Sequence, residues 1–317
     1  MPMLIFFGGL ANVLQYLGVT QKVVSLIGYF VSFITGFSPV TAFAAVANIF
    51  LSPNEVILMI RSMLPSLSLS ELHCLLTSGI GTIDGGLIAV YISFGIPSQH
   101  LLLASLMSAP ASLVVANILL PDEDAGKTSK KLQLHTVEAK GIVDAFSGGA
   151  RSLVVVVAEI LVMLIAFIAL VEFLNMTLAW FGDRAGLDIT FQTLCAYIFT
   201  PVAFLMGIEW DDCFKAAELI GVKVVINEFV AYADLAALIE NRRQGLTPAI
   251  SERSEAIVTY ALSGFENLAT AGSMIGFIAS IAPTRRGDVS QVTLRSLLAG
   301  LAGSFMTGCI ASTLYME

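Results

Sequence analysis

The long uncharged stretches of this chain constrain its fold more than any other feature, because each is long enough to cross a lipid bilayer as a helix. Residues 87–120 contain no Asp, Glu, Lys or Arg and are divided into two apolar runs by Gly-Ile-Pro-Ser at 95–98. A membrane-spanning helix needs about 20 apolar residues. The other stretches of this kind are residues 1–21, 267–284, 296–316 and, with Glu159 as the single charge, 153–171. The sequence therefore predicts an all-α, multi-pass membrane protein.

Composition agrees with this class and narrows the possible partners. Of the 317 residues, 56% are hydrophobic and 13% are charged, whereas soluble domains carry about 25% charged residues. The net charge of −8 argues against a nucleic-acid partner, since phosphate binding needs a basic surface. The four cysteines and three histidines are scattered without the spacing of metal ligands, so we expect neither a zinc site nor a disulfide framework.

The most informative motif is GVKVVINEFVAY at residues 221–232, which places Lys223, Asn227 and Glu228 in an otherwise apolar stretch. An ionised side chain at the bilayer centre costs about 2.5–3.5 kcal/mol on insertion scales, so such residues usually face a cavity, a partner or a substrate path. We therefore expect Glu228 to be a site residue. The alternative interpretation is a buried structural ion pair between Glu228 and Lys223 or another cation.

Two halves of the chain resemble each other weakly. Residues 77–95 and 262–280 both have Ser-Gly near their start and further glycines inside an apolar span. Each is preceded by an apolar segment with a polar interruption, at 47–56 and 224–232. Such a duplication is typical of secondary transporters whose site lies at the membrane midplane between two repeats. Non-helical backbone at that depth is tolerated where it is buried in protein or lines a watery cavity.

The motif at 221–232 resembles the signature of the concentrative nucleoside transporter family, Gly-x-Lys-x-x-x-Asn-Glu-Phe-Val-Ala followed by an aromatic residue or Met. The resemblance extends over nearly the whole chain. Other strings that look like the family are ANIFLS (47–52), YISFGIP (91–97), SLMSAPASL (105–113), PVAFLMGIEWDDC (201–213) and ALSGFENLAT (261–270). Agreement at six separated places is hard to obtain by chance.

The resemblance implies a sodium-coupled importer of nucleosides in the plasma membrane, which moves a transport domain past a fixed scaffold and assembles as a homotrimer. Its implied fold has inverted repeats, two re-entrant helical hairpins (38–66 and 209–240) and two broken transmembrane helices (69–95 and 253–283). The implied segments are a scaffold helix with an interfacial helix (1–36), a first transport-domain repeat (37–120), a loop with an interfacial helix (121–150), a scaffold helix (151–182), a connecting interfacial helix (183–208) and a second transport-domain repeat (209–317).

The resemblance also implies the substrate site. The ribose-binding glutamate of the family falls on Glu228, its ribose-facing asparagine on Asn267, and the neighbouring hydroxyl on Thr270. Phe265 falls on the stacking aromatic residue, and Leu87 on a further substrate contact. Ribose hydroxyls donate to a carboxylate and exchange hydrogen bonds with an amide, so these residue types suit a nucleoside.

Sodium is the coupling ion that the resemblance implies. Its ligands would be the side-chain oxygens of Asn48 and Thr82 and the backbone carbonyls of Leu51 and Ile83. Coordination by oxygen alone is what a hard cation prefers. The membrane potential supplies about 2.3 kcal/mol per charge per 100 mV, which is enough for concentrative uptake.

The tip expected to read the base departs from the family pattern. The family normally has Gln-Thr-Glu where this chain has Pro53, Asn54 and Glu55. Glu55 is kept, but the preceding amide and hydroxyl are replaced by a residue without a side-chain hydrogen bond and by a different amide. Ser52 falls at the position that tracks purine or pyrimidine preference. The alternative for Glu55 is a structural role near Arg61, where the hairpin leaves the membrane.

Two further acids depart from the family, which usually has a small uncharged residue where Asp84 and Glu266 stand. They favour either an additional cation or proton, or altered transport activity. For other residues the structural alternatives are ordinary core packing for Phe265, interhelical hydrogen bonds for Asn48 and Asn267, and a contact with a neighbouring helix or subunit for Glu159.

Other functions are less compatible with these residues. An intramembrane aspartyl protease needs two deep aspartates, and Asp84 alone is deep here, so we expect no enzyme. A channel has little use for two matched hairpins with carboxylates. The remaining alternatives are a truncated or transport-impaired homologue and an elevator-type carrier of a different small polar substrate.

Overall fold

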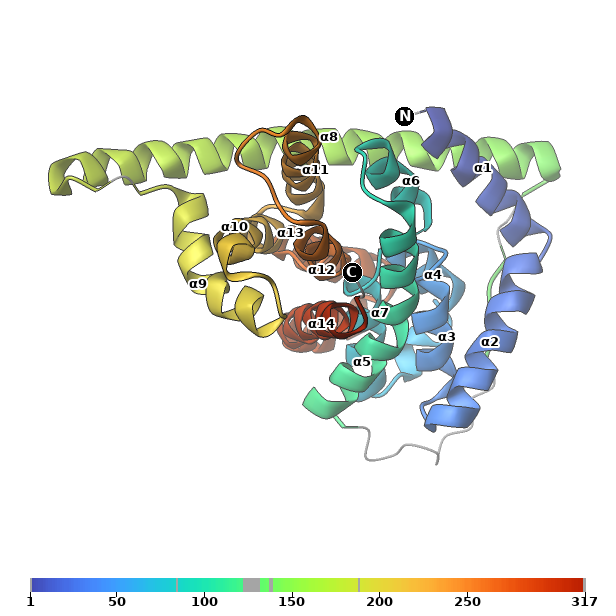
Figure 1. Cartoon of the computed structure of the whole chain (residues 1–317). Helices are drawn as coiled ribbons and strands as arrows, with labels where there is room; N and C mark the ends of the chain where they lie inside the picture. The colour runs from blue at the N-terminus through green and yellow to red at the C-terminus, as the bar shows by residue number, and fades with distance from the viewer. Residues whose placement is uncertain (1, 84, 122–131, 137–138, 188, 316–317) are drawn as a thin grey trace.

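The computed structural model describes residues 2–83, 85–121, 132–136, 139–187 and 189–315, and within these ranges it is helical, with no β-strand (Figure 1). The helices of the first half are α1 (Pro2–Tyr16), α2 (Val19–Thr35), α3 (Pro39–Ala47), α4 (Pro53–Met59), η1 (Leu64–Ser66), α5 (Leu69–Ile80), α6 (Gly85–Ser93) and α7 (Ser98–Leu119). Those of the second half are α8 (Ile142–Ala185), α9 (Phe191–Leu205), α10 (Trp210–Val225), α11 (Glu228–Gln244), α12 (Glu252–Leu262), α13 (Leu268–Ile281), η2 (Pro283–Arg285) and α14 (Arg286–Leu314). The expected all-α class is confirmed for the described residues.

Membrane-spanning character is clear in three segments. Among the described residues, 69–93, 98–119 and 283–314 are long and apolar enough to cross a bilayer. A fourth is possible if α1 and α2, which are bent by 79° at their junction, count together. Large apolar side chains lie exposed on α8, such as Ile165 at 71%, because a membrane protein turns such residues toward lipid.

The long helix α8 lies along one edge of the molecule (Figure 1), with α1 packed on it. Its 44 residues run without a break. One continuous helix therefore lies on both sides of the boundary expected at residue 150 between an interfacial helix and a scaffold helix. Helix α9 follows α8 and packs mainly on α10.

At four places, one helix ends and the next begins after a few residues. The interruptions separate α3 from α4, α5 from α6, α10 from α11 and α12 from α13. Polar N-cap side chains restart three of these helices: Ser52 for α4, Asn227 for α11 and Asn267 for α13. Each accepts a hydrogen bond from a backbone N–H of the first turn, which stabilises a helix end that has no preceding turn.

Candidate functional site

The breaks in the two long interrupted helices lie against each other. The backbone N–H of Phe265, between α12 and α13, donates to the carbonyl of Ile80 at the end of α5 over 2.6 Å. Helix α14 covers both breaks through Gly300, where an added Cβ would lie 2.9 Å from Glu266 Cγ and 3.5 Å from Gly81. Freed backbone groups from both halves of the chain are therefore concentrated in one place.

Glu228 and Asn267 form a buried hydrogen-bonded pair beside these breaks. Asn267 Nδ2 donates to Glu228 Oε2 over 3.2 Å, and the two residues are 3% and 2% exposed. Asn267 Oδ1 accepts from the backbone N–H of Thr270 over 2.8 Å, which fixes the orientation of the amide. Glu228 is the first residue of α11, where the helix dipole favours a carboxylate. Three of the expected substrate residues are thus brought together.

Lys223 does not pair with Glu228. Its ammonium lies 2.7 Å from Glu266 Oε2 and donates to the carbonyl of Ala261 over 2.7 Å. Both charged side chains are fully buried. The alternative interpretation of a Glu228–Lys223 couple is therefore wrong, because a different acid, one that departs from the family pattern, takes this role.

Two features of the fold accommodate the Glu266 side chain, one by leaving space and one by a hydrogen bond. Gly264 has a φ of +131°, and an added Cβ there would lie 2.3 Å from the carboxylate. Ser304 on α14 hydrogen-bonds Glu266 Oε1. Since a buried carboxylate needs both charge compensation and hydrogen bonds, Glu266 is an integral part of this packing.

Phe265 and Leu87 belong to one hydrophobic cluster, together with Ile83, Tyr91 and Tyr232. Phe265 is 9% exposed and Leu87 is 7% exposed. Their packing is that of ordinary core residues, and their contact with a substrate remains a prediction.

The four residues expected to bind sodium are all buried. Asn48 follows α3 and donates from Nδ2 to Ser78 Oγ on α5 over 3.1 Å, whereas its Oδ1 has no hydrogen-bond partner. Thr82 Oγ1 accepts from Ser108 on α7 over 3.1 Å. An added Cβ at Gly85 would lie 3.4 Å from the carbonyl of Phe50, so the two interruptions adjoin each other. A buried, unpaired carbonyl oxygen is unusual and is the kind of ligand that a hard cation takes.

The remaining members of this set are Leu51 and Ile83. The carbonyl oxygen of Ile83 accepts from the Ser105 hydroxyl over 3.0 Å, and a carbonyl has a second lone pair for a cation. Leu51 is 3% exposed in the hydrophobic cluster around α4. Asp84 lies outside the described residues, and so does the side chain of Glu159.

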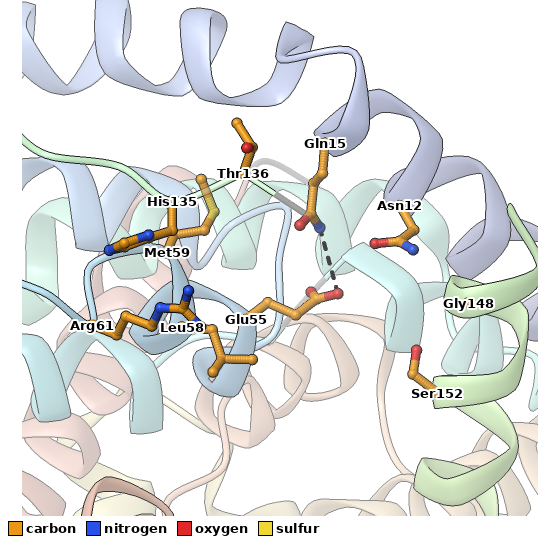
Figure 2. Close-up of a pocket in the computed structure, with 10 residues that line it drawn as sticks. All are labelled: Asn12, Gln15, Glu55, Leu58, Met59, Arg61, His135, Thr136, Gly148 and Ser152. Atoms are coloured by element: carbon orange, nitrogen blue, oxygen red, sulfur yellow. Dashed lines mark hydrogen bonds between the residues drawn. The ribbon is translucent and has the colours of Figure 1, made fainter. Parts of the chain in front are cut away.

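The Ser52–Glu55 group forms the start of α4. Glu55 and Ser52 form a capping box at the start of α4, in which Glu55 Oε2 accepts from the Ser52 N–H over 2.9 Å. Glu55 Oε1 accepts from Gln15 on α1 over 3.5 Å (Figure 2). Pro53 packs near Gly79, and Asn54 is exposed. Among the described residues, no hydrogen bond connects this group to Glu228 or Asn267.

A cavity of about 490 Å³, lined by polar and apolar residues, adjoins Glu55. Figure 2 shows residues from α1, α4, the turn after α4, α8 and the segment before α8 around it. The lining residues are Asn12, Gln15, Glu55, Leu58, Met59, Arg61, His135, Thr136, Gly148 and Ser152. Sequence reasoning did not find Gln15 or Asn12, although both are polar residues in the uncharged stretch 1–21. It also did not find Ser105, Ser108 and Ser304, because a small hydroxyl in an apolar span carries no signal of its own.

Buried acids and amides beside interrupted helices are features that this molecule shares with the class of membrane transport proteins. The family model described as "Na+ dependent nucleoside transporter C-terminus" matches residues 100–312. The chain belongs to this family. Solute carrier family 28 member 3 of Homo sapiens is 41% identical over an alignment 324 residues long, gaps included, which covers 99% of this chain and 47% of that protein. Sodium/nucleoside cotransporter 1 of Mus musculus is 39% identical, over 100% of this chain and 50% of that protein. The chain therefore spans about half the length of these relatives.

Solved structures of CNTnw are also similar to this chain. CNTnw in an inward-facing substrate-bound state is 32% identical with a TM-score of 0.90, covering 98% of this chain and 73% of that one. A CNTnw variant in an intermediate state is 31% identical with a TM-score of 0.93, covering 99% of this chain and 75% of that one. The arrangement of helices described above is thus that of the concentrative nucleoside transporter structures.

Proposed function

We propose that this chain is a sodium-coupled nucleoside symporter that imports nucleosides by alternating access. The observation that carries the proposal is the Glu228–Asn267 pair, in which a buried carboxylate is bonded to an amide while the nearby ammonium of Lys223 is engaged by Glu266. Family membership and the similarity to CNTnw support the same function. It is a carrier function, with no chemical step.

Ribose recognition follows from the chemistry of this pair. The carboxylate of Glu228 accepts from sugar hydroxyls, and the Asn267 amide donates to a hydroxyl oxygen. Thr270 adds a hydroxyl in the same turn as Asn267. Phe265 and Leu87 provide apolar surface toward the base, and Ser52, Pro53, Asn54 and Glu55 form the tip that selects among bases. A site built to hydrogen-bond hydroxyls discriminates strongly against an analogue that lacks them.

Sodium is held by Asn48, Leu51, Thr82 and Ile83 in this proposal. The unpaired Oδ1 of Asn48 and the carbonyl of Ile83 fit a hard cation, because both are buried oxygens with a free lone pair. The sodium gradient supplies the driving force for uptake, and these four residues hold the ion next to the start of α4. Asn48 is itself oriented by its hydrogen bond to Ser78.

The conformational change in this proposal involves two inverted repeats. Residues 38–66 and 209–240 form re-entrant hairpins in a transport domain (37–120 and 209–317), which slides as an elevator past scaffold helices α1 and α8. The exposed apolar face of α8 contacts lipid and neighbouring copies in a homotrimer at the plasma membrane. Chemical cross-linking of the chain in native membranes tests the trimer, which is excluded if monomers alone are recovered.

Uptake of radiolabelled uridine and adenosine by cells expressing the chain, in sodium or choline buffer, tests the function. We expect sodium-dependent uptake that falls at least about tenfold in Glu228→Gln, because a hydrogen bond to a charged group contributes about 1.5–3 kcal/mol. The matched control is Glu240→Gln, since Glu240 is an exposed acid on the same helix. Uptake that needs no sodium, or that survives Glu228→Gln, excludes this symporter. Uptake of a dicarboxylate instead indicates a carrier of another substrate.

A further inference from the structure

Lys223 and Asn48 hold comparable places in the two halves of the molecule. Asn48 stands four residues before Ser52, the N-cap of α4, and Lys223 stands four residues before Asn227, the N-cap of α11. Asn48 reaches Ser78 in the last turn of α5, and Lys223 reaches Ala261 in the last turn of α12. Both side chains therefore extend from one interrupted helix pair to the end of the facing half-helix.

The two places differ in charge. Around Asn48 the described residues offer oxygens without a positive charge, and Asn48 Oδ1 has no hydrogen-bond partner. Around Lys223 the chain supplies both the cation and its oxygens, with the Glu266 carboxylate and the Ala261 carbonyl each 2.7 Å from the ammonium. Both Lys223 and Glu266 are fully buried.

From this difference, and building on the proposed sodium site, we propose that the Lys223 ammonium is a built-in cation. It fills, in the second half, the position that corresponds to the sodium site of the first half. The pair of Lys223 and Glu266 thereby limits this carrier to one external sodium ion at these two positions.

The reason is electrostatic. Two breaks that touch through Phe265 and Ile80 share a water-poor environment, where charges interact much more strongly than in water. A tethered ammonium neutralises Glu266 permanently, because an unpaired acid at this depth is costly. The carboxylate is then not available to a free cation. Replacement of Lys223 by a neutral residue leaves an acidic, oxygen-lined position whose chemistry suits a second sodium ion.

Binding of ²²Na⁺ to the purified full chain in detergent, together with thermal unfolding in NaCl or choline chloride, tests this inference. We expect Lys223→Ala to bind a second sodium ion per chain and to gain a sodium-dependent rise in Tm, since a ligand that binds the folded state stabilises it. Both gains persist when Asn48→Ala is added. The matched control is Lys223→Met with Glu266→Ala, which lacks the ammonium and the carboxylate and binds no second ion.

The inference is overturned if folded Lys223→Ala binds the same amount of sodium as the unsubstituted chain. Lys223→Gln, which retains a hydrogen-bond donor toward Ala261, is judged by the same criteria if Lys223→Ala does not yield folded protein. Absence of sodium binding by the unsubstituted chain counts against the proposed function instead. The two failures are therefore distinguishable.

Discussion

The two halves of the molecule share an order of helices but place opposite kinds of group where their helices are interrupted. Among the described residues of α3–α7, which leave out Asp84, the centre is neutral, with the Asn48 amide leaving one oxygen unpaired. In α10–α14 the centre is ionic, with Lys223 and Glu266 satisfying each other and Glu228 bonded to Asn267. In the proposed function the first half receives a cation from outside, whereas the second half already contains charges of both signs. Similar interruptions of the backbone can therefore differ in charge through only one or two side chains.

The largest expected effect comes from breaking the ionic centre. Glu266→Ala leaves the Lys223 ammonium buried without its partner, and we expect a loss of about 3–5 kcal/mol in stability. Thermal unfolding of the purified chain in detergent measures it. Replacing both residues, as Lys223→Met with Glu266→Ala, restores most of the loss because no unpaired charge remains. Unchanged stability in the single variant would show that the pair is not a structural requirement.

The neutral centre is tested by Asn48→Ala, which removes the unpaired oxygen. We expect the sodium concentration for half-maximal uptake to rise at least about tenfold, as for a lost contact to a charged group. Asn241→Ala is the control, since the Asn241 amide bonds the Pro248 carbonyl at the surface. An equal sodium requirement in Asn48→Ala and the unsubstituted chain contradicts the proposed ligand set.

The contact between the halves is probed on α14. In Gly300→Ala the new Cβ would lie 2.9 Å from Glu266 Cγ, and overpacking of this kind costs about 1–3 kcal/mol. Gly303→Ala is the matched control, because its Cβ would meet its nearest neighbour at 3.7 Å, an ordinary contact. Thermal unfolding of both variants measures the difference. Equal stability would mean that Glu266 can shift at little cost.

The smallest effect is expected at a helix start in the first half. Ser52→Ala removes the N-cap of α4 and half of its capping box, and should destabilise the protein by about 1 kcal/mol. Ser52→Thr keeps a capping hydroxyl and should retain most of the stability. Chemical unfolding of the two variants compares them, and equal losses would assign the effect to packing rather than to the cap.

Local signals in the sequence were sufficient to predict the fold class and the places where helices are interrupted. The uncharged runs predict membrane helices, and Pro53 and Asn227 stand where α4 and α11 begin. The extent of α8 was not predictable in this way, because its charged and polar start at residues 142–152 resembles a surface helix. Helix α8 packs against α1, a contact that no local pattern records.

The site residues were likewise predicted from the sequence, whereas some of their contacts were not. Glu228 and Asn267 were expected from the motifs that contain them, and the structure brings them into contact. The partner of Lys223 was not determined by its neighbours along the chain, because Glu228 and Glu266 were both available acids. Glu55 was expected beside substrate, yet its hydrogen bonds go to its own helix start and to Gln15.

The sequence by itself determined that this is a helical membrane protein with interrupted helices, since hydrophobicity, capping residues and prolines act within one or two turns of chain. Only the tertiary structure decided which acid neutralises Lys223 and which oxygen remains unpaired. Those outcomes depend on distances between segments far apart in sequence, and electrostatic and hydrogen-bond energies change steeply with distance inside a low-dielectric interior.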